Sequence, residues 1–519
     1  MFINKFQFKN KKVEVEIESN LYFSDSNSFV FGYPLTKDLS EINSSNIHEI
    51  IHNINGYFLI IYVSDDDFLV ANDITGGFRL YYCETSEGYF LSDNFQSVLN
   101  RYSQFVDLEI NQNEIDFWRR QDYTSGGRTF FKGVNKLQPG MVLNFDPKVS
   151  KSNFYFKDVF NNPNIKEYSK VVHKSISDSF KILKERDESV VLMFSGGLDS
   201  TLLALELIAQ EINFTPVFFH LKPSFTVADD DFIKCKFISE KLGLKTRYID
   251  VDWEKEFSDY SAIVKELLVN RHVAVGHYAT ARIIAKEFGF NVTIVNGQGA
   301  DSIFSYGPTS KGFTDILVRV MYYTKSMTRA YLIDLVLQFL QFFRKRTGKY
   351  YKYYNPQSRN GLLAFFDGAG YLPILNVLRD KHSLIYSMNI VDSVTSKLND
   401  WNAKMMALKI HGFLQGPANQ VVYRSFIHNN IHKVLLPYCS SEIIHGTVKF
   451  RNNLWDIFYP KYVVSDIVNN YFGFNYPGNF PKSNKNKDEK TVDISIIQNS
   501  SNLKYELELD NLLSTYKKA

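Results

Sequence analysis

The stretch of sequence that decides the fold is Val191-Leu192-Met193-Phe194-Ser195-Gly196-Gly197-Leu198-Asp199-Ser200. Its apolar first half predicts a buried strand, and the helix-like run 201–208 follows at once. The backbone N–H groups of Ser195, Gly196 and Gly197 are therefore expected to converge with a helix N-terminus on an anion. The hydroxyls of Ser195 and Ser200 add donors. The pattern predicts a phosphate-binding turn, which is not a Walker A loop because no lysine follows the glycines.

A second polar turn follows a predicted strand at 292–295 and consists of Asn296-Gly297-Gln298-Gly299-Ala300-Asp301. Ligands of open parallel sheets bind beyond the carboxyl ends of the strands, so both turns are expected to lie at one site. A carboxylate beside a triphosphate is tolerated mainly when Mg²⁺ lies between them. Asp199 and Asp301 are therefore predicted to share one Mg²⁺ ion, with Asn296 and Gly297 close to the phosphates.

The composition is that of a folded protein with two or more domains. The chain has 519 residues, of which 45% are hydrophobic and 15% are aromatic. Its 59 basic and 56 acidic residues nearly cancel, which gives no electrostatic case for nucleic-acid binding. The three cysteines, Cys83, Cys235 and Cys439, are widely spaced, which fits a reducing compartment and argues against structural zinc. With no visible secretory signal or transmembrane segment, a cytoplasmic protein is expected.

The pattern of apolar residues changes along the chain. Residues 12–145 consist of short apolar or alternating runs broken by turns, which predicts a β-rich domain. Between 160 and 306 strands alternate with helical stretches, which predicts a parallel sheet covered by helices. The strand candidates are 190–194, 215–221, 246–251 and 292–296. Helical periodicity dominates from 312 to 450, and the polar stretch 482–490 is expected to be a mobile loop.

The turn at 195–200 resembles the Ser-Gly-Gly-x-Asp-Ser loop of the PP-loop ATP pyrophosphatases, which split ATP between its α and β phosphates. Together with the turn at 296–301, it resembles the synthetase domain of the asparagine synthetase family, which includes β-lactam synthetases, carbapenam synthetases and lasso-peptide cyclases. Four further segments are similar to motifs of that family, namely Asn72 to Tyr82, Arg128 to Gly140, Val434 to Tyr438 and Pro460 to Val464. The resemblance thus extends over residues 50 to 470.

This resemblance implies an α/β fold in three parts. Residues 1–150 would form a β-rich sandwich like that of the N-terminal-nucleophile (Ntn) hydrolases, here a degenerate glutaminase domain. Residues 160–475 would form a PP-loop ATP pyrophosphatase domain, a parallel sheet with a helical C-terminal part. Residues 476–519 would form a polar loop and tail.

The resemblance also implies an AMP- and pyrophosphate-forming amide ligase that uses ATP and Mg²⁺. The triphosphate would lie in the turn 195–200, and the adenine would lie near the main chain of Leu221. A substrate carboxylate would be adenylated, and ammonia or an amine would then attack the acyl carbon. Lys461 matches the family lysine and would stabilise the oxyanion of that step. Lys461, Asp199 and Asp301 are therefore the candidate catalytic residues.

Four departures from the family narrow the predicted function. Glutamine-dependent members expose a cysteine as first residue, whereas Phe2 follows Met1 here, so no glutaminase activity is expected. Gln298, on the acceptor side, stands where lactam synthetases have a tyrosine base, and glutamine has no useful pKa for that role. Ser302 and Ser465 replace a family glutamate and arginine. Formation of a β-lactam is therefore not expected.

Other functions stay open on the sequence. An asparagine synthetase running on free ammonia would carry the same residues, and a non-catalytic relative would keep the nucleotide-binding parts. The acceptor is equally open between a peptide, a glycan and a small metabolite. A partner protein from the same biosynthetic cluster would fit the first two of these acceptors.

Several residues have two open interpretations. Asp230 and Asp231 either contact the nucleotide or cap a helix that begins at Phe232. His272 and His277 either line the acceptor pocket or pack among other residues. Two segments are likewise open: the apolar run 330–343 as a buried or an interfacial helix, and the basic, aromatic run 345–354 as a helix end or a contact for an anionic acceptor.

Overall fold

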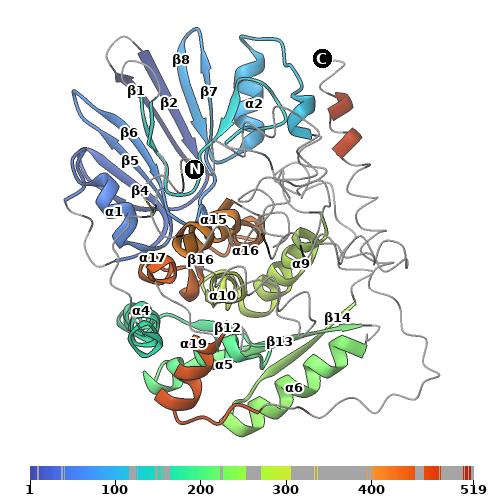
Figure 1. Cartoon of the computed structure of the whole chain (residues 1–519). Helices are drawn as coiled ribbons and strands as arrows, with labels where there is room; N and C mark the ends of the chain where they lie inside the picture. Colours follow the sequence, from blue (N-terminus) through green and yellow to red (C-terminus); the bar gives the residue numbers. More distant parts are fainter. Residues whose placement is uncertain are drawn as a thin grey trace.

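The structure is a computed structural model in which most of the chain is described. The described residues are 1–115, 124–145, 150–152, 164–222, 226–252, 271–304, 401–449 and 461–480, with short gaps inside these ranges and a few single positions elsewhere. They form a two-sheet β-sandwich followed by a parallel sheet with helices around it (Figure 1). The prediction of a mixed α/β fold with a parallel sheet is thereby confirmed.

The first sheet of the sandwich has five strands. In spatial order they are β1 (Phe2–Phe8), β2 (Lys11–Ile17), β8 (Gly88–Ser92), β7 (Tyr81–Thr85) and β9 (Val134–Lys136). In β2, charged and apolar residues alternate, and Val13, Val15 and Ile17 are buried on one face. β2 runs parallel to β8, and the other neighbouring pairs are antiparallel.

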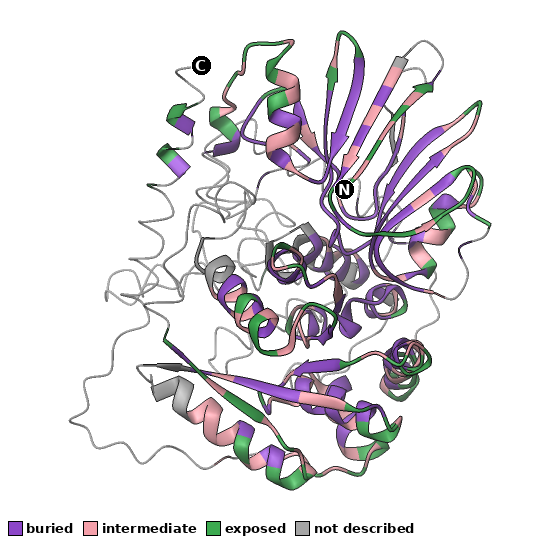
Figure 2. Ribbon diagram, turned by 180° about the vertical axis from the view of Figure 1, so that it is seen from behind, coloured by how far each residue is buried: buried purple, intermediate pink, exposed green. Residues whose placement is uncertain are grey.

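The second sheet of the sandwich has six strands, all antiparallel to their neighbours. In spatial order they are β11 (Ser150–Ser152), β10 (Val142–Asn144), β6 (Phe68–Asn72), β5 (Asn55–Val63), β4 (Ser28–Leu35) and β3 (Leu21–Ser24). Aromatic rings join the two sheets edge to face, with centroids 5.1 Å apart for Phe2 and Phe31 and 4.9 Å apart for Tyr89 and Phe145. Buried residues accordingly dominate β4, β5, β6 and β8, whereas β1 and β3 are mostly exposed or partly exposed (Figure 2).

The parallel sheet has five strands, in the order β14 (Arg247–Asp252), β13 (Phe214–Lys222), β12 (Val190–Met193), β15 (Thr293–Val295) and β16 (Lys433–Leu435). All four neighbouring pairs are parallel. The four predicted strands are confirmed to within one residue at each end. Along the chain, β13 and β14 are added on one side of β12, and β15 and β16 are then added on its other side. The carboxyl ends of β12 and β15 therefore flank the topological switch point, where ligands of such sheets bind.

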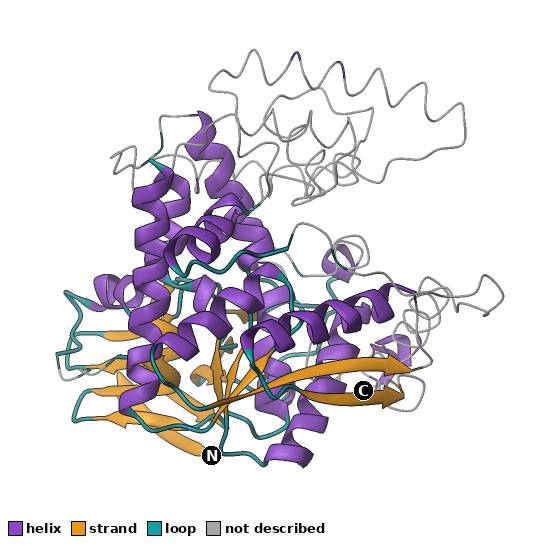
Figure 3. Cartoon of the chain, turned by 90° about the horizontal axis from the view of Figure 1, so that it is seen from below, coloured by secondary structure: helices purple, strands orange, loops and turns teal. Residues whose placement is uncertain are grey.

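Helices lie on both faces of the parallel sheet and between it and the sandwich (Figures 1 and 3). Those in the sandwich are α1 (Ile47–Asn53) and α2 (Phe95–Ser103), and those near the sheet are α4 (Ile165–Glu185), α5 (Leu198–Ala209), α6 (Thr226–Leu242), α9 (Arg271–Phe288) and α10 (Ala300–Phe304). The later ones are α15 (Trp401–Gln415), α16 (Pro417–His428), α17 (Ser441–Lys449), α19 (Tyr462–Asp466), the 3₁₀ turn η1 (Pro437–Cys439) and the π-helical turn η2 (Ile467–Tyr471). Asn164 caps the N-terminus of α4 in a capping box with Glu167.

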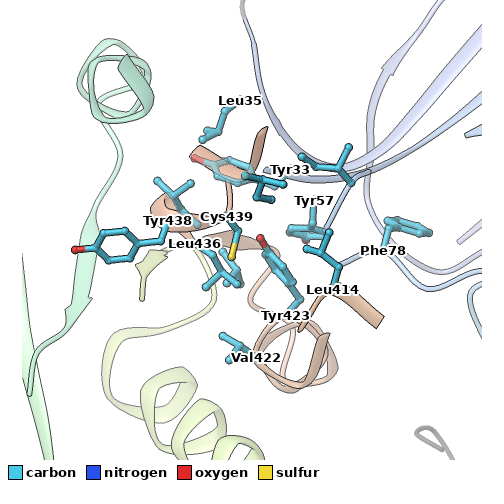
Figure 4. Packing of buried hydrophobic residues seen from close by; sticks show 14 of the residues in the cluster. Tyr33, Leu35, Tyr57, Phe78, Leu414, Val422, Tyr423, Leu436, Tyr438 and Cys439 are labelled. Atoms are coloured by element: carbon cyan, nitrogen blue, oxygen red, sulfur yellow. The ribbon is translucent and has the colours of Figure 1, made fainter. Parts of the chain in front are cut away.

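The sandwich and the parallel sheet are joined by a buried, partly aromatic contact (Figure 4). The rings of Tyr57, from β5, and Tyr423, from α16, lie 5.0 Å apart between centroids. The hydroxyl of Tyr57 donates a hydrogen bond to the backbone carbonyl of His432, just before β16. Because these contacts belong to one continuous apolar core, the two parts are expected to unfold together.

One prediction about helix ends is wrong. Asp230 and Asp231 do not cap a helix at Phe232, because α6 begins at Thr226 and both aspartates lie within it. The Asp231 carboxylate instead forms an ion pair with Lys234, three residues further along α6, at 2.5 Å.

Several predictions cannot be compared with the structure. The segments 345–354 and 482–490 lie outside the described residues, as does 330–343 apart from Leu332 and Val336. Among the described residues, no helix has both the length and the apolar character that crossing a membrane requires.

Candidate active site

Three charged side chains from distant parts of the sequence meet at the switch point. Asp199 lies in the first turn of α5, directly after β12, and Asp301 lies in α10, after β15. The Lys461 ammonium lies between them, 2.5 Å from Asp199 Oδ2 and 2.5 Å from Asp301 Oδ1. The structure therefore brings all three candidate catalytic residues together.

Asp199 and Asp301 line a pocket of about 320 Å³ at the carboxyl ends of the strands, and Lys461 contacts both of them. Its lining residues are Met193, Phe194, Ser195, Asp199, Ser200, Val217, Phe218, Phe219, Asn296, Gly297, Gln298, Gly299, Asp301 and Ser302. The polar residues come from the two predicted turns and from Ser302, just after the second turn, whereas the apolar ones come mainly from β12 and β13. One end of the pocket is thus suited to charged groups and the other to an apolar or aromatic group.

The glycine-rich turn is held by hydrogen bonds of its own. The Ser195 N–H donates to Ser200 Oγ, and the Gly197 N–H donates to Ser195 Oγ, each at 3.2 Å. The helix begins earlier than expected, so Ser200 lies in the first turn of α5 and its hydroxyl donates to the Gly197 carbonyl at 3.1 Å. The N–H groups of Ser195 and Gly197, which are predicted to bind an anion, therefore donate hydrogen bonds to serine hydroxyls in this structure. A bound anion would either displace these hydroxyls or share the N–H groups with them.

Gly196 is required at its position for two reasons. Its φ angle is +65°, a left-handed conformation that favours glycine, and a Cβ atom there would lie 2.6 Å from Cα of Cys235 in α6. The turn is thus pressed against the backbone of α6. This close approach also places the Cys235 thiol within 3.3 Å of the Phe194 carbonyl, to which it donates.

We expect Gly196→Ala to destabilise the protein by about 2–4 kcal/mol, because overpacking against α6 adds to the backbone strain. Thermal or chemical unfolding of the full chain measures this. Gly243→Ala is a matched control, since Gly243 also has φ +65° but has no atom within 4 Å of the added Cβ. If both variants lose equal stability, the contact with Cys235 contributes nothing.

Asp199 is held from its backbone as well as from its side chain. The Tyr438 hydroxyl, from η1, donates to the Asp199 carbonyl at 2.8 Å. Asp199 Oδ2 accepts from Lys461, whereas the buried Oδ1 atom has no hydrogen-bond partner among the described residues. A buried carboxylate oxygen without a partner is costly in a protein interior, and such atoms commonly face a ligand or ion site.

Lys461 has a strained backbone that aims it into the site. Its φ angle is +63°, in the left-handed region, and α19 starts at the next residue. The side chain is 17% exposed, and burial of the ammonium alone would lower its pKa. The carboxylates of Asp199 and Asp301 outweigh that effect and raise the pKa of Lys461, so the side chain is a cation at neutral pH.

The donor set suits a magnesium ion that is shared with phosphates. Asp199 Oδ2 and Asp301 Oδ1 each lie 2.5 Å from the Lys461 ammonium, so the distance between these two oxygens is at most twice that value. Asp199 Oδ1 is available to a further partner. Within the described residues there is no cluster of three or more His, Cys, Asp or Glu side chains that would hold a metal alone. Mg²⁺ usually takes one or two carboxylates together with substrate phosphates, so these residues fit it. A divalent ion and the Lys461 ammonium would compete for the same carboxylates.

The remaining predicted residues lie at different distances from this centre. Asn296 Oδ1 accepts the Gln298 N–H at 2.8 Å, which shapes the second turn, and all three residues from Asn296 to Gln298 line the pocket. A Cβ on Gly297 would lie 3.6 Å from the Asp199 Cβ, so the two turns are in close contact. β13 contributes Val217, Phe218 and Phe219 to the lining, whereas the side chain of Leu221, further along the same strand, lies outside the described residues.

Of the two histidines with open interpretations, His277 lies in α9 and is not a lining residue of the pocket. Burial lowers its pKa to about 4, so it is neutral at physiological pH. The side chain of His272 lies outside the described residues.

Two tyrosines near the turn were not predicted: Tyr438, which contacts Asp199, and Tyr476, whose hydroxyl donates to the Gly196 carbonyl at 2.9 Å. Tyr438 stands in a quoted motif, but no sequence pattern marks Tyr476.

Fold and site together define a class: an α/β protein with a glycine-rich turn, paired carboxylates and a lysine at the switch point of a parallel sheet. Residues 172–418 match the family model described as asparagine synthase. This match confirms the resemblance to the asparagine synthase family for these residues. Asp199 and Asp301 lie within the matched residues, and Lys461 lies beyond them.

One curated relative is the microcin J25-processing protein McjC of Escherichia coli, which is 24% identical over 167 residues. The match covers 31% of this chain and 30% of that protein, so the chain matches less than a third of its relative's length. Two solved structures each share 18% identity and a TM-score of 0.20: an NMN synthetase from Francisella tularensis (28% of this chain, 58% of that one) and an NH3-dependent NAD synthetase from Campylobacter jejuni (35% and 88%). TM-scores this low support no argument about the present chain.

Proposed function

We propose that this protein is a carbon–nitrogen ligase that uses ATP to activate a carboxylate as its acyl-adenylate and transfers the acyl group to ammonia or an amine. The observation that carries the proposal is the meeting of Lys461, Asp199 and Asp301 beside a glycine-rich turn, in a chain whose residues 172–418 match the asparagine synthase family model. Accordingly, residues 160–475 would be a PP-loop ATP pyrophosphatase domain, and residues 1–150 a glutaminase-like Ntn sandwich without glutaminase activity.

In the first step, an oxygen of the substrate carboxylate attacks the α phosphorus, and the bond from that phosphorus to the β-phosphate oxygen breaks. Pyrophosphate leaves, and the acyl-adenylate remains. The turn from Ser195 to Ser200 would orient the β and γ phosphates through its N–H groups and hydroxyls. When bound at Asp199 and Asp301, Mg²⁺ would neutralise charge on the phosphate oxygens. The apolar side of the pocket, at Val217 and Phe218, would take the adenine, with a main-chain contact near Leu221.

In the second step, the amine nitrogen attacks the acyl carbon, AMP leaves, and the amine loses a proton. The tetrahedral intermediate carries an oxyanion, and the Lys461 ammonium is the cation in the site that would donate to it. Gln298 lines the pocket on the acceptor side but cannot remove the proton. We therefore infer that Gln298 contacts the acceptor through hydrogen bonds and that the proton leaves to solvent or to the leaving AMP.

We further propose that the acceptor nitrogen does not come from glutamine hydrolysed by this chain. All three cysteines of the sequence are buried thiols. Burial raises the pKa of Cys83 to about 12 and that of Cys235 to about 12, and it also raises the pKa of Cys439. A thiol attacks as its thiolate, so none of these side chains is an activated nucleophile.

The relative McjC is named as a processing protein of microcin J25, which favours a peptide as the substrate that supplies the carboxylate and the amine. An asparagine synthetase that uses aspartate and free ammonia has the same chemistry and is the second candidate. The two differ in the size of the acceptor, since a peptide would extend out of the pocket, whereas ammonia needs no further space.

Exchange of labelled pyrophosphate into ATP by the full chain tests the first step, with Mg²⁺ and candidate carboxylates present. We expect exchange that depends on a carboxylate, with AMP formed once an amine is added. Exchange with aspartate, followed by asparagine formation with ammonium, would favour the second candidate. No exchange, together with no heat of Mg·ATP binding in calorimetry, would contradict the proposal and favour a non-catalytic relative.

A further inference from the structure

The chain segment that delivers Lys461 returns to the phosphate turn a second time. It runs through α19 and η2, which pack on α4 and α5, and then continues toward α6 (Figure 1). Its first residue, Lys461, contacts Asp199, and Tyr476, 15 positions later, contacts Gly196. We refer to residues 461–476 as the strap.

The strap holds itself together with a short chain of hydrogen bonds. The Ser465 N–H donates to the Lys461 carbonyl at 3.0 Å, and Asn469 Nδ2 donates to Ser465 Oγ at 2.9 Å. Asn469 Oδ1 in turn accepts the N–H of Tyr476 at 3.0 Å. Ser465, which replaces a family arginine, therefore belongs to a link between the two ends of the strap.

The ring of Tyr476 is also fixed from its other side. It lies 5.6 Å from the ring of Phe480 between centroids, and Phe480 lies 6.1 Å from the ring of Phe237 on α6. Burial raises the pKa of the Tyr476 hydroxyl, and the negative charges of Asp199 and Asp231 raise it further. The hydroxyl is therefore protonated at any working pH and acts as a donor to the Gly196 carbonyl.

A hydrogen bond to this carbonyl fixes a phosphate donor on the opposite side of the same peptide unit. In a trans peptide the C=O of Gly196 and the N–H of Gly197 point in opposite directions. Tyr476 holds the carbonyl on the strap side, so the Gly197 N–H must point into the turn, where it meets Ser195 Oγ. Because glycines flank this peptide, it would otherwise rotate easily.

We propose that Tyr476 is a positioning residue that orients the Gly196–Gly197 peptide of the phosphate turn. This rests on the proposed function, since the turn must bind the phosphates of ATP. The strap then serves the site at both ends: Lys461 provides the charge, and Tyr476 sets the direction of a backbone donor. Loss of the hydroxyl weakens binding of the phosphate part of the nucleotide and leaves the adenosine part unaffected.

Tyr476→Phe tests the inference by removing the hydroxyl alone. Calorimetry with Mg·ATP, Mg·pyrophosphate and adenosine, using the full chain, separates the two parts of the nucleotide. We expect about three- to tenfold weaker binding of ATP and of pyrophosphate, as for one lost hydrogen bond, with unchanged adenosine affinity. In pyrophosphate exchange the KM for ATP should rise by the same factor, with kcat little changed. Tyr471→Phe is the matched control, because Tyr471 lies in the strap but is 62% exposed as a residue and does not line the pocket.

The outcomes keep this inference separate from the proposed function. If the unaltered protein binds neither ATP nor pyrophosphate, the proposed function fails. If it binds both and Tyr476→Phe binds them equally well, or loses adenosine in the same proportion, the positioning role is overturned. Should Tyr476→Phe fail to fold, Asn469→Ala releases the Tyr476 N–H while keeping the phenol, and it should weaken pyrophosphate binding in the same direction.

Discussion

Asp199→Asn is expected to remove essentially all pyrophosphate release from ATP, a loss of about 1000-fold or more. The substitution keeps the size of the side chain but removes the charge that a metal ion and Lys461 both require. A bound metal contributes several kcal/mol to such a step, and each 1.36 kcal/mol is tenfold in rate. The carboxylate is only 18% exposed, so water replaces little of what is lost. Pyrophosphate exchange under saturating Mg²⁺ measures the effect.

Asp178→Asn is the control for that experiment. Asp178 is an exposed carboxylate of α4 that pairs with two lysines of its own helix, at 2.8 Å and 3.0 Å, and lies outside the pocket. An exposed pair of this kind contributes little to stability, so exchange should stay unchanged. If Asp199→Asn keeps more than a tenth of the exchange rate, Asp199 does not hold a metal in the reaction.

Lys461→Met is expected to lower amide formation by about 100- to 1000-fold, the cost of removing one group that stabilises an oxyanion. Binding of Mg·ATP should persist, because the metal can take both carboxylates once the ammonium has gone. The variant should also unfold at a lower temperature without metal, since Asp199 and Asp301 then face each other without a cation. Added Mg²⁺ should restore part of that loss. Single-turnover formation of AMP and calorimetry with Mg·ATP measure the two effects.

Lys433→Met controls for the general cost of removing a partly buried lysine. Lys433 lies in β16, where it forms an ion pair with Glu188 at 3.6 Å, and it does not line the pocket. Its loss should affect stability but not turnover. Equal losses of turnover in the two lysine variants would show that Lys461 acts through the fold and not on the reacting groups.

The sequence alone was sufficient for those features that depend on neighbours in the chain. The strand at 190–193 and its glycine turn follow from an apolar run that ends at small residues, because backbone pairing and close approach are local requirements. Asp301 was found in the same way, as a carboxylate after a later strand of the sheet. Lys461 was found only through the family resemblance, since nothing near it in the sequence distinguishes it from a surface lysine.

The first residues of two helices differ from the predicted ones, and the cause is local. Asp230 and Asp231 have the residue type of helix caps, but α6 begins earlier, at Thr226. An aspartate is also tolerated inside a helix when a lysine lies one turn further on, as Lys234 does here. Likewise α5 includes Asp199 and Ser200 from its first turn, where a carboxylate is favoured by the helix dipole.

By itself, the sequence determined the parallel sheet, the two polar turns with one carboxylate each, and the match of residues 172–418 to the asparagine synthase family model. Only the tertiary structure placed Lys461 against Asp199, 262 positions away, and Tyr476 against Gly196, 280 positions away. Short-range patterns specify elements through hydrogen bonds between near neighbours. A contact between remote segments depends on how those elements pack, and neither partner carries a local mark of it.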